Sequence, residues 1–227
     1  MPNKQLQLDS WRIFRIVAEF VDGFEKMSNI GPSVSIFGSA RMKADNPYYI
    51  MSRDLAQKIA NKGFAIITGG GPGAMTAANE GAQLGKAPSC GIAIALPYEE
   101  THNPHIDRKY LLNVRYFFVR KVLFIRYAVA FVFMPGGFGT FDELFEALTL
   151  IQTKKIKRFP LFLVGCSYWN GLLDWLKEKA LSEGFLSAED FDLLTVTDDL
   201  DLVAQRISEY ALEGPSVIPT FDLGEET

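Results

Sequence analysis

The chain has 227 residues, 48% of them apolar, a formal net charge of −4 and a mean hydropathy near zero. These values predict a globular protein with one sizeable core. The acidic balance and the lack of a long basic run argue against nucleic acid as a partner. The longest apolar stretch, 128–135, is too short to span a bilayer, so no membrane association is expected.

The N-terminal region and the cysteines indicate a cytoplasmic protein. Arg12 and Arg15 interrupt the apolar residues near the N-terminus, which argues against a signal peptide. Cys90 and Cys166 each lie in a separate apolar, strand-like run and are expected to be buried free thiols.

The first predicted element is an amphipathic helix over 9–27. Its apolar residues recur at helical spacing along one face, namely Trp11, Phe14, Val17, Val21 and Phe24. Such a face can bind a partner or a membrane surface, but packing on its own domain or on a sister subunit is the favoured interpretation. We therefore divide the chain into this N-terminal helical segment (1–30), a nucleotide-binding catalytic domain (31–212) and a loose C-terminal tail (213–227).

Strands and helices are predicted to alternate through the rest of the chain. The strands are expected at 33–38, 64–68, 90–96, 114–118, 130–134, 159–165 and 194–196. The helices are expected at 47–62, 73–84, 119–127, a segment beginning near Thr140, 169–182 and 198–210. This order predicts an α/β fold with a doubly wound, Rossmann-like parallel sheet in a single domain.

Two turns that follow early strands are candidate ligand sites. Ser39, after the first strand, begins a turn of small residues that ends at Arg41. After the second strand, 69–73 is glycine-rich and fits the dinucleotide pattern only loosely. That pattern belongs after a first strand, so the sequence favours a mononucleotide over NAD.

The most informative stretch is PGGFGTFDE, residues 135–143. A buried strand precedes it, and a helix with periodic apolar residues follows it. Gly136, Gly137 and Gly139 can expose backbone N–H groups at the start of that helix, where the helix dipole also favours an anion. The stretch therefore predicts a phosphate site.

Thr140 and Glu143 leave two interpretations open. Their T-x-x-E spacing is that of a capping box, in which both side chains satisfy the helix's own N–H groups. The same spacing places a carboxylate within one turn of the phosphate site, where it can perform chemistry.

The loop expected at 97–113 carries His102, His105 and Asp107. A zinc or iron site is conceivable there, but a lid or subunit-contact loop is favoured because no further ligand cluster occurs. No metal and no cofactor is expected.

The stretch 135–143 resembles the P-G-G-x-G-T-x-x-E signature of the Lonely Guy family, cytokinin-activating nucleoside 5′-monophosphate phosphoribohydrolases long labelled lysine decarboxylases. The pair Arg120 and Lys121 and the turn TGGGPGAM at 68–75 match two further family elements. The resemblance implies catalytic roles for Glu143 and Arg120 and a small-molecule nucleotide substrate such as AMP or isopentenyl-AMP. The substrate-binding residues it implies are Gly136, Gly137, Gly139, Thr140, Gly70, Gly71, Gly73, Ser39 and Lys121.

The resemblance also carries one difference and one implication for assembly. Many family members have Met three positions before the arginine, where this chain has Phe117, so the base pocket is expected to differ in shape. A homo-oligomer, a dimer or larger, is implied, and the 18 Phe residues and the apolar N-terminal helix agree with it.

Two other functions compete with hydrolysis. Related proteins carry the molybdenum cofactor, so a nucleotide or cofactor carrier without chemistry is one alternative. A lysine decarboxylase is the other, but nothing around Lys121 or Lys154 has the character of a pyridoxal phosphate site.

Overall fold

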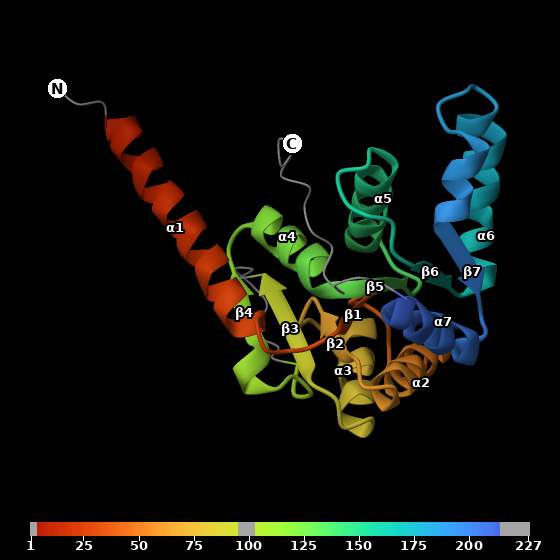
Figure 1. Cartoon of the computed structure of the whole chain (residues 1–227), viewed down its shortest axis with the longest axis horizontal. Helices are drawn as coiled ribbons and strands as arrows, with labels where there is room; N and C mark the ends of the chain where they lie inside the picture. Colours follow the sequence, from red (N-terminus) through yellow and green to blue (C-terminus); the bar gives the residue numbers. More distant parts are fainter. Residues whose placement is uncertain (1–3, 95–102, 214–227) are drawn as a thin grey trace.

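The computed structural model describes residues 4–94 and 103–213, with side chains described from Trp11 onward. Its centre is one seven-stranded parallel sheet in the order β4-β3-β2-β1-β5-β6-β7 (Figure 1). The strands are β1 (Ser33–Phe37), β2 (Ala65–Thr68), β3 (Ser89–Ile94), β4 (Leu111–Val114), β5 (Ala128–Phe133), β6 (Leu161–Val164) and β7 (Leu194–Thr197). The predicted doubly wound α/β fold is confirmed.

Helices cover both faces of this sheet (Figure 1). They are α1 (Lys4–Met27), α2 (Pro47–Asn61), α3 (Ala74–Leu84), α4 (Phe117–Tyr127), α5 (Phe138–Gln152), α6 (Cys166–Trp175) and α7 (Leu200–Glu213). Residues of α1, α4, α5 and α6 join one apolar core cluster, and residues of α2, α3 and α7 join the other. The central strands β1, β5 and β6 are buried along their whole length, as expected in a parallel sheet with helices on both faces.

Aromatic rings fill the core beneath α4 and α5. Phe37 of β1 lies 5.0 Å from Phe124 and 5.1 Å from Phe131, centroid to centroid, with both pairs edge to face. Phe131 makes a similar contact with Phe159 at 5.0 Å. Edge-to-face pairs are favoured by the ring quadrupoles. They fix β1 and β5 against the helix that carries Arg120.

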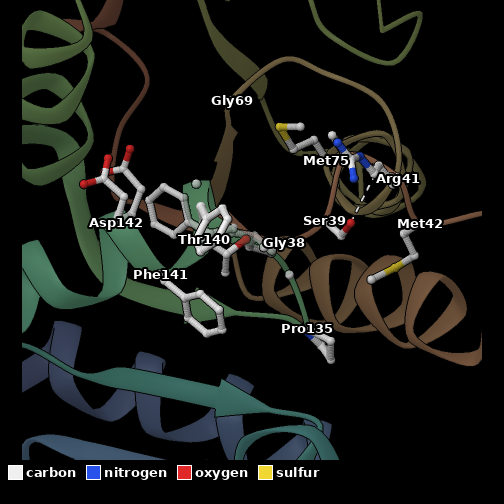
Figure 2. Close-up of a pocket in the computed structure, with 18 of the residues that line it drawn as sticks. Gly38, Ser39, Arg41, Met42, Gly69, Met75, Pro135, Thr140, Phe141 and Asp142 are labelled. Atoms are coloured by element: carbon white, nitrogen blue, oxygen red, sulfur yellow. Dashed lines mark hydrogen bonds between the residues drawn. The ribbon is translucent and has the colours of Figure 1, made fainter. Parts of the chain in front are cut away.

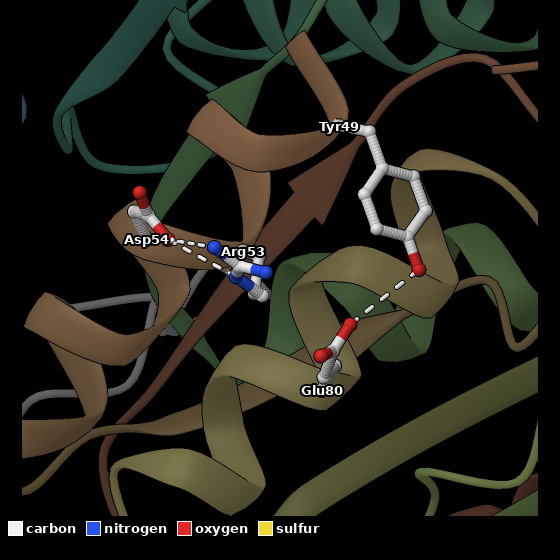
Figure 3. A network of polar contacts seen from close by, with 4 residues as sticks. All are labelled: Tyr49, Arg53, Asp54 and Glu80. Atoms are coloured by element: carbon white, nitrogen blue, oxygen red, sulfur yellow. Dashed lines mark hydrogen bonds and ion pairs between the residues drawn. The ribbon is translucent and has the colours of Figure 1, made fainter. Parts of the chain in front are cut away.

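The helices α2 and α3 pack on the opposite face, where a small polar network joins them at the surface (Figure 3). The Tyr49 hydroxyl of α2 donates to Glu80 of α3 at 3.5 Å, and burial together with the Glu80 charge raises the pKa of Tyr49. Arg53 pairs with its neighbour Asp54 at 3.0 Å. The contact between Tyr49 and Glu80 joins α2 to α3, whereas the Arg53–Asp54 pair lies within α2.

Only the C-terminal half of α1 packs on the domain, and the rest projects away from it (Figure 1). A Cβ at Gly23 would come within 2.7 Å of Leu123, so this glycine lets α1 approach α4 closely. The Glu19 carboxylate accepts the N–H groups of Arg115 and Tyr116 at 3.0 and 3.3 Å. The apolar stripe Trp11, Phe14, Val17, Val21 and Phe24 is 41–67% exposed.

The segment between β3 and α4 differs from the prediction. The predicted loop 97–113 contains the turn η1 (Arg108–Tyr110) and most of β4, and the strand expected at 114–118 was wrong. Leu111–Val114 pairs instead with β3, whereas Phe117 opens α4. Short apolar runs suit either element, and here the edge of β3 decides the outcome.

Near the C-terminal end of the sheet, α6 begins at Cys166 and continues into a π-helical turn, η2 (Leu176–Leu181). Cys90 is buried in β3, as predicted. Cys166 is only half-buried, contrary to the prediction, because it is the first residue of α6 and does not lie in a strand. A capped turn, η3 (Ala188–Leu193), precedes β7. The predicted tail lies, except for Glu213, outside the described residues.

Candidate active site

A pocket of about 970 Å³ lies where the turns after β1, β2 and β5 meet the starts of α4 and α5. Sheet order reverses at β1, which has β2 on one side and β5 on the other. Ligands of open α/β sheets bind at such a switch point, outside the carboxyl ends of the strands. Figure 2 shows Arg41, Met42 and Met75 toward one end of the pocket and Asp142 toward the other.

The floor of the pocket is closed by direct contact between two turns. Ser39 donates its N–H to the Pro135 carbonyl at 3.1 Å. A Cβ on Gly136 would overlap the Thr140 hydroxyl and come within 3.0 Å of the Ser39 nitrogen. Only glycine fits at residue 136, and the backbone beside it faces the pocket.

The helix α5 begins two residues earlier than predicted. Gly137 is its N-cap, and the Gly137 carbonyl accepts the N–H groups of Thr140 and Phe141. Thr140 is therefore the third helical residue, and the capping-box interpretation of Thr140 and Glu143 was wrong. Helix geometry leaves the first N–H groups, those of Phe138 and Gly139, without a carbonyl partner inside the helix. They border the pocket, together with the Thr140 side chain.

Glu143 is the buried carboxyl group of the pocket, with 6% of its surface exposed. Burial raises the pKa of Glu143 from 4.5 to about 7, because a carboxylate loses hydration there. The positive charges of Lys121 and Arg120 act in the opposite direction, and the carboxylates of Glu146 and Asp142 reinforce the rise. A carboxyl group that titrates near neutral pH can hold or release a proton during a reaction.

Arg120 enters the pocket from α4. Its guanidinium lies 5.2 Å from the Phe124 ring centroid, a cation–π distance. A Cβ on Gly69 would overlap the same guanidinium. The glycine turn after β2 therefore makes the space that Arg120 occupies.

Comparison with known proteins places this architecture in a family. The family model described as "Possible lysine decarboxylase" matches residues 75–207, more than half of the chain. The chain belongs to the Lonely Guy family. The cytokinin riboside 5′-monophosphate phosphoribohydrolase LOG3 of Arabidopsis thaliana is 25% identical over 182 residues, covering 78% of this chain and 82% of LOG3. LOG7 of the same plant is 35% identical over 95 residues, 41% of this chain and 43% of LOG7.

Solved structures share the fold of this Lonely Guy protein. The structure of TM1055 superposes with a TM-score of 0.59 at 20% identity, covering 78% of this chain and 99% of TM1055. The molybdenum cofactor carrier protein of Chlamydomonas reinhardtii gives a TM-score of 0.55 at 16% identity, covering 80% and 99%. At these identities the likeness concerns the fold alone.

The pocket brings together most, but not all, of the residues predicted for the site. Those that line it are Ser39, Arg120, Gly136, Gly137, Gly139, Thr140 and Glu143. Gly70, Gly71, Gly73 and Lys121 are not among the lining residues. Gly73 has a positive φ of 68°, and a Cβ there would overlap the Ser39 carbonyl, so it packs one turn onto the other.

Aromatic residues of the pocket were missed by the sequence analysis. Tyr168, near the start of α6, donates its hydroxyl to the Gly136 carbonyl. The hydroxyl oxygens of Tyr48, near the start of α2, and Ser167 lie 2.8 Å apart, at hydrogen-bond distance. Phe138 is 93% exposed at the mouth. Tyr168 comes four residues after the end of β6. Its position just after a central strand was the sequence feature from which its place at the pocket could have been predicted.

The histidines have different outcomes. His102 lies outside the described residues. His105 contacts Gln83, Nδ1 to Oε1, at 2.9 Å and does not line the pocket. Within residues 4–94 and 103–213, no group of three or more His, Cys, Asp or Glu side chains is placed to hold a metal ion, and no helix is long and apolar enough to cross a membrane.

Proposed function

We propose that this Lonely Guy protein hydrolyses the N-glycosidic bond of a nucleoside 5′-monophosphate, such as AMP or a cytokinin riboside monophosphate, to a free base and ribose 5-phosphate. The observation that carries the proposal is the buried Glu143 carboxyl group beside Arg120, in the same pocket as the glycine loop and the start of α5. The names of the LOG relatives support it.

The substrate phosphate would bind at the start of α5. The N–H groups around Gly137 and Gly139 and the Thr140 hydroxyl border the pocket there. The positive end of the helix dipole favours an anion at the same place. Ser39, fixed against Pro135, would contact the phosphate or the ribose from the opposite turn.

The bond would break through a transition state with positive charge on the ribose ring, as in glycoside hydrolysis. The Glu143 carboxylate would stabilise that charge and orient the attacking water, which adds its oxygen to the anomeric carbon. One proton of that water would pass to Glu143 while the departing base takes the bonding electron pair. Glu143 would then pass this proton to the base, which restores the carboxylate. Arg120 would hold the ribose phosphate by charge-assisted hydrogen bonds.

The test is chromatography of AMP and isopentenyl-AMP incubated with the wild type, Glu143→Gln and Glu143→Ala. Free base and ribose 5-phosphate are expected from the wild type. Loss of a general base lowers turnover by about 100-fold or more, and KM should change little because Glu143 acts in the transition state. Full turnover by Glu143→Gln would overturn its assignment.

The alternative is a non-catalytic carrier of a nucleotide or of the molybdenum cofactor, favoured by the shared fold of the Chlamydomonas carrier. A carrier should retain its ligand through purification, whereas a hydrolase should release products. Mass spectrometry of the denatured, freshly purified protein separates the two. The decarboxylase alternative would need a lysine free to form a Schiff base, whereas Lys121 is paired with two carboxylates.

Two further expectations belong to the proposal. The exposed apolar stripe of α1 would be buried against a second copy, giving a homo-dimer or larger assembly. Light scattering of the wild type and of Phe14→Glu should then show an oligomer and its dissociation. The free thiols Cys90 and Cys166 fit a reducing, cytoplasmic location.

A further inference from the structure

Lys121 forms an ion-pair cluster just outside the pocket. Its Nζ lies 2.9 Å from Asp142 Oδ2 and 3.1 Å from Glu146 Oε2, and its side chain is only 16% exposed. Burial alone would lower the pKa of Lys121, but the hydrogen bonds to these two carboxylates hold that pKa above its ordinary value. Lys121 is therefore a partly buried positive charge held by two carboxylates.

The cluster joins the two helices that carry the proposed catalytic groups. Lys121 follows Arg120 on α4, and Asp142 and Glu146 lie one helical turn apart on α5, on either side of Glu143 in the sequence. A single ammonium group that contacts both carboxylates fixes the register of α4 against α5. It thereby sets where Arg120 and Glu143 lie relative to each other.

The same cluster determines the charge around Glu143. The groups that act on it are Lys121 and Arg120 from α4, which favour its carboxylate, and Glu146 and Asp142 from its own helix, which disfavour it. Three acidic side chains within five residues would repel one another without a cation between them. Lys121 supplies that cation.

We propose that Lys121 is a positioning residue, which clamps α4 to α5 through Asp142 and Glu146 and thereby orients Glu143 and favours its ionised form. This inference rests on the proposed function, in which Glu143 is catalytic. It gives Lys121 a role different from substrate binding. To reach a phosphate, its ammonium group would have to leave both carboxylates, and Lys121 does not line the pocket.

The first experiment is the pH profile of kcat/KM for AMP in the wild type, Lys121→Met, Lys121→Arg and Glu146→Gln. The acid limb is expected near the titration of Glu143, at about pH 7. In Lys121→Met it should move up by about one pH unit, lowering kcat/KM about tenfold at pH 6. In Glu146→Gln it should move down, because a negative charge is lost. Lys121→Arg should restore the wild-type limb.

Specific outcomes would overturn the proposal. If Lys121 had only a structural role, Lys121→Met and Glu146→Gln would lower kcat/KM at all pH values. The acid limb of the pH profile would then stay at the wild-type pH in both variants. A role as phosphate ligand would raise KM in Lys121→Met and leave the limb in place. Thermal unfolding of each variant identifies any loss of the fold.

The second experiment does not need activity. Carbon-13 NMR of protein labelled at the glutamate side-chain carboxyls follows the titration of Glu143, whose signal is assigned by its loss in Glu143→Gln. Its midpoint should rise in Lys121→Met and fall in Glu146→Gln. An unmoved midpoint refutes the clamp even if base is released. Moved midpoints with no base from the wild type support the clamp and refute the hydrolase.

Discussion

Replacing Glu143 by glutamine should reduce the loss of stability of the protein at alkaline pH while lowering the proposed activity by about 100-fold or more. The pKa of Glu143 rises from 4.5 to about 7 on folding because the carboxyl group is buried. An acidic group whose pKa is higher in the folded protein than in the unfolded protein stabilises the fold only while the group is protonated. That contribution is complete below about pH 4.5 and is lost as the pH rises through about 7.

The size of the effect follows from the two pKa values. A pKa rise of about 2.5 units at about 1.4 kcal/mol each corresponds to about 3.5 kcal/mol, of which about 2.5 kcal/mol falls between pH 5 and pH 8.5. Glutamine cannot ionise and is free of this loss. The free energy of unfolding of Glu143→Gln, relative to the wild type, should therefore improve by about 2.5 kcal/mol between these pH values.

Urea denaturation of both proteins at pH 5 and pH 8.5 measures this double difference, which cancels any pH-independent change in hydrogen bonding. The matched control is Glu209→Gln, at an exposed glutamate of α7, which should show no such change. A Glu143→Gln variant whose relative stability is the same at both pH values would refute the reasoning. It would mean that Glu143 is ionised without cost in the folded protein.

Four substitutions test the pocket walls. Gly136→Ala should destabilise the protein by about 1–3 kcal/mol, because its methyl group would overlap the first turn of α5. Gly137→Ala, whose Cβ meets nothing within 4 Å, should change the free energy of unfolding only by the loss of a favourable N-cap residue, about 1 kcal/mol or less in the same urea assay. Gly69→Ala should displace the Arg120 guanidinium and lower kcat/KM by about tenfold or more with an unchanged melting temperature; equal kcat/KM would contradict the placement of Arg120. Tyr168→Phe removes a hydrogen bond to the Gly136 carbonyl and should cost about 1 kcal/mol in urea denaturation; an unchanged midpoint would show that this bond contributes nothing.

The sequence predicted the architecture well because β5 and β6 are continuous apolar runs, and β1, β2 and β5 are each followed by a turn that contains glycine. Their alternation with amphipathic helices was sufficient for the doubly wound sheet. It was insufficient between β3 and α4, where Phe117 and Phe118 begin a helix instead of ending a strand. There the position of the strand, Leu111–Val114, depends on its pairing with β3. A local sequence pattern does not predict such a pairing.

Within the site, the glycine loop and its helix were predictable, whereas the environment of Glu143 was not. The spacing of Thr140 and Glu143 fits a capping box as well as a catalytic site, and the start of α5 at Phe138 excludes the capping box. The ion pairs of Lys121 join α4 to α5, two helices that are separated by a strand in the sequence. Contacts of that kind are set by the tertiary fold.

Because Glu143 lies on α5, the helix fixes the distance between its own first turn and the Glu143 residue. Glu143 lies four residues beyond Gly139, which at a rise of 1.5 Å per residue is about 6 Å along the axis. If the phosphate binds at the start of α5 as proposed, the phosphate and the carboxyl group would be held about 6 Å apart along one rigid helix. In the proposed reaction, a nucleoside without a phosphate would lack the group that positions its anomeric carbon beside Glu143. A diphosphate would shift the anomeric carbon away from the carboxyl group. Selection of the monophosphate would then be a matter of length, decided before any contact with the base.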